Sequence, residues 1–272
     1  MQQLGSIQEI GRSSVLSGAS LRLAEPDLAV SLRKDREASL VVDVAKTGCL
    51  GLGLRTRTER VGPEAALVDE FLGEVSFVHS GEERVFIFKE PQIGQSFPDV
   101  VVVVYESKNL EQWPEARREL TTEDLRLIQL IHTNRGATRN ELKLFLGKVP
   151  SRCLDRLYAA QMIEQKGDRW QTRELSSIFA LNSVLAFEAK MSPTSKVLEQ
   201  ALANKWFATN SAILVPSIGG RSRIAEAAKR HDLRVYTKPV GRRLAIRPKR
   251  FNKPLSYASW IINEWAWRMA TQ

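Results

Sequence analysis

Five consecutive valines at residues 100–104 constrain the fold of this chain more than any other feature. A strand that is apolar at every position has no wet face, so both of its faces must be covered. Such strands are typical of the centre of a mixed or parallel sheet. The chain has 272 residues, 43% of them hydrophobic, which is enough for a core of that kind. We therefore expect an α/β protein with a mixed central sheet.

Residues 1–60 are expected to form a β-rich extension that precedes this core. The chain alternates apolar and polar residues at 20–32, has an apolar run at 39–44 and then becomes rich in glycine. This pattern favours short antiparallel strands joined by turns.

The core itself is predicted to start at Pro63, which suits the first turn of a helix. Apolar residues then recur at helical spacing up to residue 75. Residues 76–78 and 84–89 are expected to be strands on either side of a turn, and the valine strand follows.

Between the valine strand and the C-terminal half, the periodicity becomes helical. Thr121 is expected to cap one helix, and residues 138–141 form a capping box for a second. A third helix should begin at Ser151, and residues 163–172 should form a hairpin with Gly and Asp at its turn. Three short helices and a hairpin resemble a winged helix-turn-helix domain, covering residues 119–174.

After this segment the chain returns to an α/β rhythm of strand, helix, strand, helix and strand. The expected elements are residues 184–190, 195–207, 212–215, 222–231 and 233–236.

The first of these strands ends in Glu188-Ala189-Lys190. Alternate residues of a strand share a face, so Glu188 and Lys190 should lie on one side, roughly 7 Å apart. A charged pair at the end of a buried strand costs desolvation energy, which a divalent metal with a phosphate would offset. The alternative is an ordinary surface strand end. Gln200 lies ten residues beyond Lys190, on the predicted helix.

A buried strand that begins with Pro98-Asp99 and another strand that ends in Glu188-x-Lys190 together resemble the PD-(D/E)XK nuclease superfamily. The resemblance covers residues 63–105 and 176–236, with the winged helix inserted between the second and third core strands. It implies a central sheet of restriction-endonuclease-like type. It also implies that Asp99, Glu188 and the carbonyl of Ala189 hold Mg²⁺ (or Mn²⁺).

In that resemblance Lys190 orients the attacking water or stabilises charge on the phosphorus, and Gln200 positions the water or a phosphate oxygen. An additional acidic residue would come from the first helix, as Glu70 or Glu74, unless these belong to a solvated face.

Two other carboxylates compete with Asp99. Glu106 lies seven residues further along the same strand, roughly 23 Å away at about 3.3 Å per residue and on the opposite face, so it cannot share a metal with Asp99. Glu174 precedes Glu188 by fourteen residues and stays open as an alternative ligand.

The distribution of charge suggests a polyanionic partner. The formal net charge is +9, and residues 219–254 alone hold twelve Lys or Arg against two acidic residues. Such a concentration favours phosphate binding, although a solvated basic tail is the alternative. The resemblance implies double-stranded DNA. Its predicted contacts are Arg152, Arg156, Lys166 and Arg169 of the winged helix and Arg242, Arg243, Arg247, Lys249 and Arg250 of the basic segment.

Other site chemistries are disfavoured. Cys49 and Cys153 stand alone and the chain has only three His, which argues against zinc sites and disulfide frameworks. No membrane span or signal peptide is apparent, which predicts a cytoplasmic protein. The last helix, within residues 255–272, carries Trp260, Trp265 and Trp267, which pack on the body of the protein, form a homodimer interface or dock a larger complex.

The predicted organisation has five parts: 1–60, an N-terminal extension; 61–118, the first half of a nuclease-like core; 119–174, the winged helix; 175–254, the second half with the basic segment; and 255–272, the Trp-bearing helix. The expected function is that of a metal-dependent endodeoxyribonuclease that hydrolyses phosphodiester bonds. Its implied setting is a mobile element or bacterial defence against foreign DNA. The alternative is a non-catalytic DNA-binding regulator or complex subunit with a degenerate nuclease core.

Overall fold

The computed structural model describes residues 40–42, 52, 55–57, 61–77, 79–80, 82–108, 110–219, 222–238 and 244–271, with only the backbone at 40–42. The strand expected at residues 20–32 and the predicted DNA contacts Arg242 and Arg243 lie outside these residues. Of the helices in the described part, none is both long and apolar enough to span a lipid bilayer.

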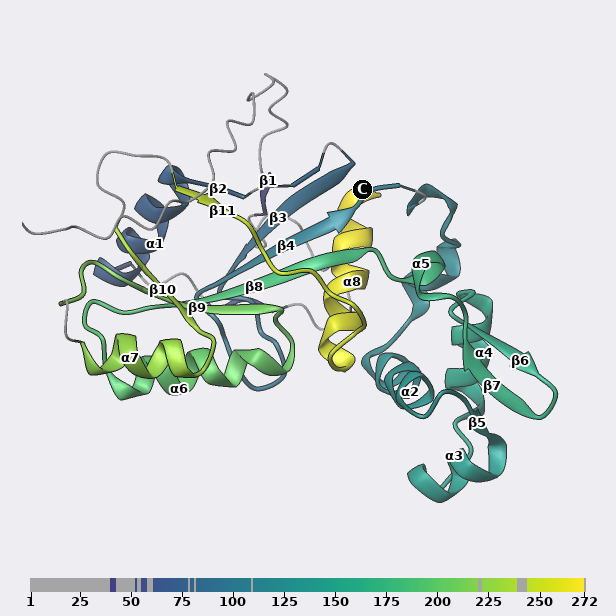
Figure 1. Ribbon diagram of the computed structural model, residues 1–272. Coiled ribbons are helices and arrows are strands. Elements are labelled where there is room, and N and C mark those ends of the chain that lie inside the picture. Colours follow the sequence, from purple (N-terminus) through teal and green to yellow (C-terminus); the bar gives the residue numbers. More distant parts are fainter. Residues whose placement is uncertain are drawn as a thin grey trace, which may run out of the picture. The chain divides into compact units, whose positions relative to one another are not determined.

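The core is a mixed six-stranded sheet in the order β1-β3-β4-β8-β9-β10 (Figure 1). Its antiparallel centre is β3-β4-β8, and the β1-β3, β8-β9 and β9-β10 pairs are parallel. The α/β class and the mixed sheet predicted from sequence are thus confirmed. The strands are β1 (Leu40–Val42), β3 (Glu83–Lys89), β4 (Val100–Glu106), β8 (Leu181–Ala189), β9 (Asn210–Val215) and β10 (Arg234–Thr237).

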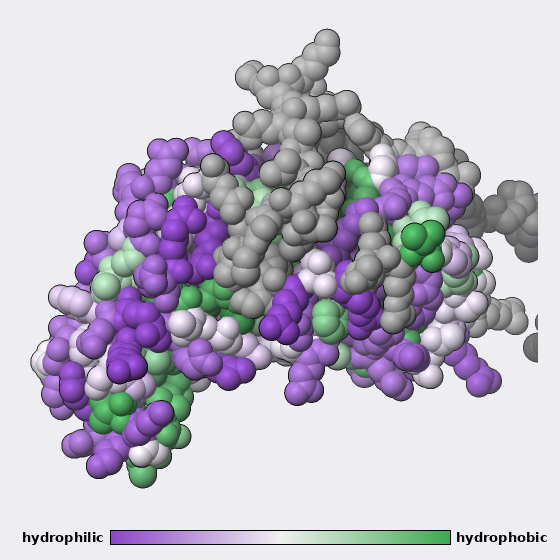
Figure 2. Space-filling view, turned by 180° about the vertical axis from the view of Figure 1, so that it is seen from behind, coloured by the Kyte–Doolittle hydropathy of each residue, from purple (hydrophilic) through white to green (hydrophobic). Residues whose placement is uncertain are grey.

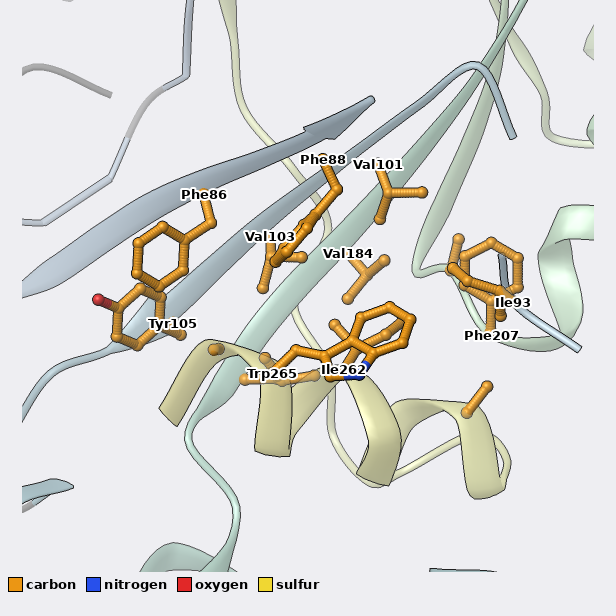
Figure 3. Close-up of a cluster of buried hydrophobic side chains, with 14 of the residues drawn as sticks. Phe86, Phe88, Ile93, Val101, Val103, Tyr105, Val184, Phe207, Ile262 and Trp265 are labelled. Carbon is orange, nitrogen blue, oxygen red and sulfur yellow. The ribbon is translucent and has the colours of Figure 1, made fainter. Parts of the chain in front are cut away.

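The valine strand β4 lies in the middle of this sheet and is buried on both faces, as its composition requires. On one face, Val101 and Val103 belong to a cluster with Phe88 and Trp265, the latter from α8 (Tyr257–Ala270) (Figure 3). On the other face, alternate valines pack with α1 (Pro63–Glu74), chiefly through Leu67 and Phe71.

Two helices complete the C-terminal half of the core. Helix α6 (Ser195–Ala203) packs on β8 and β9, and α7 (Arg223–Arg230) packs beside α6 and against β10. Val197, Ala228 and Ile213 belong to one apolar cluster there. The short 3-10 helix η3 (Asn204–Trp206) directly follows α6. These elements match the predicted helices closely, and β8 begins three residues earlier than expected.

The pairing of two short strands differs from the sequence-based expectation. β1 was expected in an antiparallel extension, but it runs parallel to β3 at the edge of the central sheet. β2 (Val75–Phe77) was expected to flank a turn with β3, but it pairs in parallel with β11 (Leu244–Ile246). In both cases the partner is distant in the chain, and local periodicity carries no information about it.

A three-helix unit is inserted between β4 and β8 and has its own apolar cluster. Its elements are α2 (Thr122–Thr133), β5 (Ala137–Thr138), α3 (Arg139–Leu146), α4 (Ser151–Ala159), β6 (Ile163–Lys166) and β7 (Arg169–Thr172). Thr121 and Thr138 form the two capping boxes with Asp124 and Glu141. Gly147 ends α3 in the left-handed conformation at φ 72°, which a glycine adopts without strain.

Helix α8 joins the insert to the sheet. Trp260 packs in the cluster of the three-helix unit, whereas Trp265 and Trp267 pack against the sheet, and all three are at most 1% exposed. Packing on the body of the protein, one of the alternatives for these tryptophans, is therefore what the structure shows. None of these three tryptophans is exposed for contact with a second copy or a larger complex.

A buried ion pair holds this junction together. Arg117, in the 3-10 helix η2 (Glu115–Glu119), donates to both carboxylate oxygens of Glu264 in α8. Arg117 Nη2, which is one of the two nitrogens that donate to Glu264, also donates to the carbonyl of Ile178, in α5 (Leu175–Ile178), at 3.0 Å. The guanidinium lies 3.5 Å from the Trp113 ring centroid, beside the 3-10 helix η1 (Leu110–Gln112).

Replacing Arg117 by Ala should therefore lower the free energy of unfolding by about 3–5 kcal/mol, because Glu264 would be left as an unpaired buried charge. Arg118→Ala is the matched control: its partner Glu115 is exposed, so we expect a loss of at most about 1 kcal/mol. Urea unfolding of both variants measures the difference. Equal losses would show that the Arg117–Glu264 pair contributes no more than a surface pair.

Candidate active site

Asp99 and Glu188 meet because β4 begins where β8 ends. The strands are antiparallel and Val100 lies opposite Phe187. Asp99, just before β4, and Glu188, near the end of β8, are therefore brought together at one end of these two strands. The backbone N–H of Ala189 donates to Asp99 Oδ2 at 2.6 Å. Two residues separated by the whole three-helix unit thus share one site.

Glu188 is a buried carboxyl with one oxygen engaged. Its side chain accepts a hydrogen bond from Asn204 Nδ2 at 2.7 Å, while Oε2 is buried without a partner among the described residues. Burial raises the pKa of Glu188 to about 8, and the nearby Asp99 adds to this rise. The hydrogen bond from Asn204 and the charge of Lys190 oppose it.

Asp99 is shifted in the same direction. Its partial burial raises the pKa of the carboxyl above the ordinary value, although the Ala189 hydrogen bond and Lys190 oppose the rise. Two neighbouring carboxyls that both resist ionisation make a site in which additional positive charge is favourable.

Lys190 is held in place by an acidic residue from α1. Its Nζ lies 2.7 Å from Glu64 Oε2, and the lysine side chain is 24% exposed. The acidic residue expected from this helix was Glu70 or Glu74, but neither lines this site. Glu70 pairs with Lys238 instead. Glu64 was missed because it sits in the first turn next to Pro63, one residue into the helix, where an acidic residue already has a helix-stabilising role.

These side chains line one open cleft of about 670 Å³. Gln200 of α6 reaches it, and its buried Oε1 has no hydrogen-bond partner in the described structure. Basic groups at the cleft are Arg57, Lys89, Lys190 and Lys196. The structure therefore brings together the four residues that the sequence singled out for catalysis: Asp99, Glu188, Lys190 and Gln200.

The oxygens of this cleft fit a hard divalent cation. Glu188 Oε2 and Gln200 Oε1 are buried acceptors with no donor in the described part of the chain, beside the second carboxyl of Asp99. The same part contains no group of three or more His, Cys, Asp or Glu able to hold a metal. A cation here would thus rest on two carboxylates, neutral oxygens and water, a ligand set that suits Mg²⁺. Ala189, proposed to offer its carbonyl, lies between Glu188 and Lys190.

The competing carboxylates lie elsewhere. Glu106 is at the far end of β4, and Glu174 is exposed at the start of α5, so neither lines the cleft. Asn204 was the other residue missed by the sequence analysis. The signal for it was its position four residues after Gln200, which places both amides on one side of the helix.

The predicted DNA contacts of the three-helix unit are mostly engaged within the protein. Arg156 donates to both carboxylate oxygens of the buried Asp124, at 2.7 and 2.8 Å. Arg169 donates to the carbonyl of Gly136 at 2.9 Å and lies 3.3 Å from Glu141. The exposed Lys166 pairs with Glu164, whereas Arg152 is exposed on α4.

The basic segment shows a similar pattern where it is described. Arg250 pairs with the buried Glu83 at 2.7 Å, and Lys249 lies 3.5 Å from Asp232. Arg247 is exposed. Part of the excess positive charge is thus compensated within the fold.

Comparison with protein-family models, with curated proteins and with solved structures finds no match for this chain.

The buried Glu188 should make stability depend on pH. Its pKa is about 8 in the folded protein against an ordinary value of 4.5, so the folded state binds this proton more tightly than the unfolded state. Without divalent metal, the free energy of unfolding should fall as the pH rises through this interval, by roughly 2–4 kcal/mol. Glu188→Gln should abolish this part of the decline.

Denaturant unfolding in the presence of a chelator, at about pH 5 and above pH 8, measures the effect. Glu174→Gln is the matched control, since this side chain is exposed and away from the cleft. Parallel pH profiles for the parent protein and Glu188→Gln would contradict the assignment.

Proposed function

We propose that this protein is a Mg²⁺-dependent endodeoxyribonuclease whose core is of restriction-endonuclease-like type. The observation that carries the proposal is the meeting of Asp99 and Glu188 across the β4–β8 pair, with Lys190 on the same strand end. Two carboxylates and a lysine at the edge of a central sheet are also what the resemblance to the PD-(D/E)XK nucleases implies.

Each residue has a distinct role in this proposal. Asp99 and Glu188 would hold the cation, with the Ala189 carbonyl. When bound, the cation supplies Lewis acidity and lowers the pKa of a coordinated water. Lys190, fixed by Glu64, would place its positive charge where negative charge builds on the phosphate. Gln200 would hold the water or a phosphate oxygen through its free amide oxygen or its N–H groups.

The substrate we propose is double-stranded DNA. The open shape of the cleft would let a DNA strand pass across it. The exposed Lys196 and Arg57 at the cleft could bind its phosphates. The three-helix unit is proposed to be a winged helix, with Arg152 as its exposed contact on α4. The setting proposed is a mobile element or defence against foreign DNA.

A non-catalytic DNA-binding regulator is the alternative. It is favoured because the described residues contain no group of three or more His, Cys, Asp or Glu able to hold a metal. It is disfavoured by the unpartnered buried oxygens of Glu188 and Gln200, because an assembly role would not require them to be left without donors.

Plasmid cleavage tests the proposal. With Mg²⁺ or Mn²⁺ the parent protein should cut the plasmid, and Asp99→Asn, Glu188→Gln and Lys190→Ala should each lower the rate at least about a hundredfold. Glu106→Gln and Glu174→Gln are matched controls that should cut normally. Calorimetry should show weaker Mn²⁺ binding for Asp99→Asn and Glu188→Gln. Cutting that survives both Glu188→Gln and Lys190→Ala would refute the nuclease.

DNA binding by the three-helix unit is tested with Arg152→Ala. Losing one phosphate contact should weaken binding to a short DNA duplex whatever its sequence. It should also reduce the slope of log affinity against log salt concentration by about one. Arg118→Ala, another exposed arginine, should leave affinity and slope unchanged. Arg156 is unsuitable for this test because its removal would leave the buried Asp124 without its ion-pair partner. An unchanged salt slope for Arg152→Ala would remove α4 from the DNA contact.

A further inference from the structure

The largest apolar cavity among those described lies outside the candidate active site, on the three-helix unit. It has a volume of about 950 Å³, near the upper end of the range for ligand pockets. Its apolar wall comes from three elements: α2, the connection from α3 to α4, and the start of α4. The residues of this wall are Leu127, Leu130, Leu146, Val149, Pro150 and Cys153. We name this cavity the α2–α4 groove.

The surface beside the groove is also unusually apolar. Leu144, Phe145 and Leu146 follow one another in α3 and are 82%, 55% and 45% exposed. Figure 2 shows hydrophobic residues at the surface of this unit, at its lower left. Three adjacent large apolar side chains that reach solvent next to a cavity mark an interaction site.

The rim of the groove is positively charged. Arg126, Lys148 and Arg152 lie on it, and no ion pair joins them to another of the described residues. Arg126 also lies over the Tyr257 ring, 5.1 Å from its centroid. Glu123 is the exposed acidic residue of the lining. Arg156 also lines the groove, but its charge is matched by Asp124.

The walls do not suit nucleic acid. The apolar residues offer no donors to phosphate, and burial raises the pKa of the Cys153 thiol to about 11, so it too remains neutral. A protein segment uses both properties, because apolar side chains fill the groove and acidic ones meet the rim.

We propose that the α2–α4 groove binds an acidic amphipathic helix of a partner protein. Apolar side chains one turn apart on that helix would enter between α2 and the α3–α4 connection, and its flanking carboxylates would pair with Lys148 and Arg126. The groove shares no lining residue with the candidate active site, so this binding does not depend on phosphodiester cleavage there.

The probe is a fluorescein-labelled helical peptide of about two heptads, with Leu on one face and Glu on the other. Fluorescence anisotropy should show micromolar affinity. A peptide with Lys in place of Glu, and one with Ser in place of Leu, should each bind at least about tenfold more weakly.

Variants of the protein locate the binding. Leu130→Ser and Lys148→Glu should each weaken the Glu/Leu peptide about tenfold, whereas Lys166→Glu, an exposed lysine outside the groove, should not. Thermal melts establish that Leu130→Ser, whose side chain is half-buried, remains folded. Glu188→Gln should abolish plasmid cutting and retain peptide binding, so failure of the nuclease and failure of the groove are separate results.

Three outcomes would overturn the proposal. Equal affinity for the Glu and Lys peptides would exclude charge complementarity. A loss of duplex DNA binding in Leu130→Ser equal to its loss of peptide binding would assign the groove to DNA. A homodimer seen by light scattering in the parent protein and lost in Leu130→Ser would show that a second copy of this chain occupies it.

Discussion

The antiparallel pairing of β4 with β8 is the contact on which the rest of the structure depends. These strands are separated in sequence by the entire three-helix unit, yet they lie side by side at the centre of the sheet. Closing so long a connection costs little more than closing a short one, because the entropy of closure grows only with the logarithm of length. A compact insert with its own core reduces the cost further. The pairing then sets the register that brings Asp99 to Glu188.

The same pairing makes the cleft electrostatically demanding. The strand residues before Glu188 are buried, so this carboxyl is carried into the sheet and loses most of its hydration. One hydrogen bond from Asn204 and the charge of Lys190 do not restore what water provided, and the pKa of Glu188 stays high. A fold that only needed a stable sheet would place an apolar residue here. The retained carboxyl is an argument for a site rather than for a scaffold.

Sequence patterns revealed those features that are encoded by neighbouring residues. The valine run specifies a central strand, and Thr138 with Glu141 specifies a helix start, because burial and capping are local properties. The sequence did not reveal Glu64 and Asn204 as site residues, for the opposite reason. Their roles come from contacts with Lys190 and Glu188, which form only after distant segments pack together. The parallel partners of β1 and β2 were missed for the same reason.

Helix α8 determines which surfaces remain open to partners. Its tryptophans, which in the sequence suggested a docking surface, are instead buried in the two apolar clusters that α8 joins. Arg117 neutralises the acidic Glu264 at the same junction. With α8 buried, an apolar contact with another protein must use some other part of the chain. Among the described residues, α3 offers the longest run of exposed large apolar side chains. Since α2 and α4 carry the internal ion pair of Arg156 with Asp124, the groove between them keeps its shape while its outer rim remains cationic.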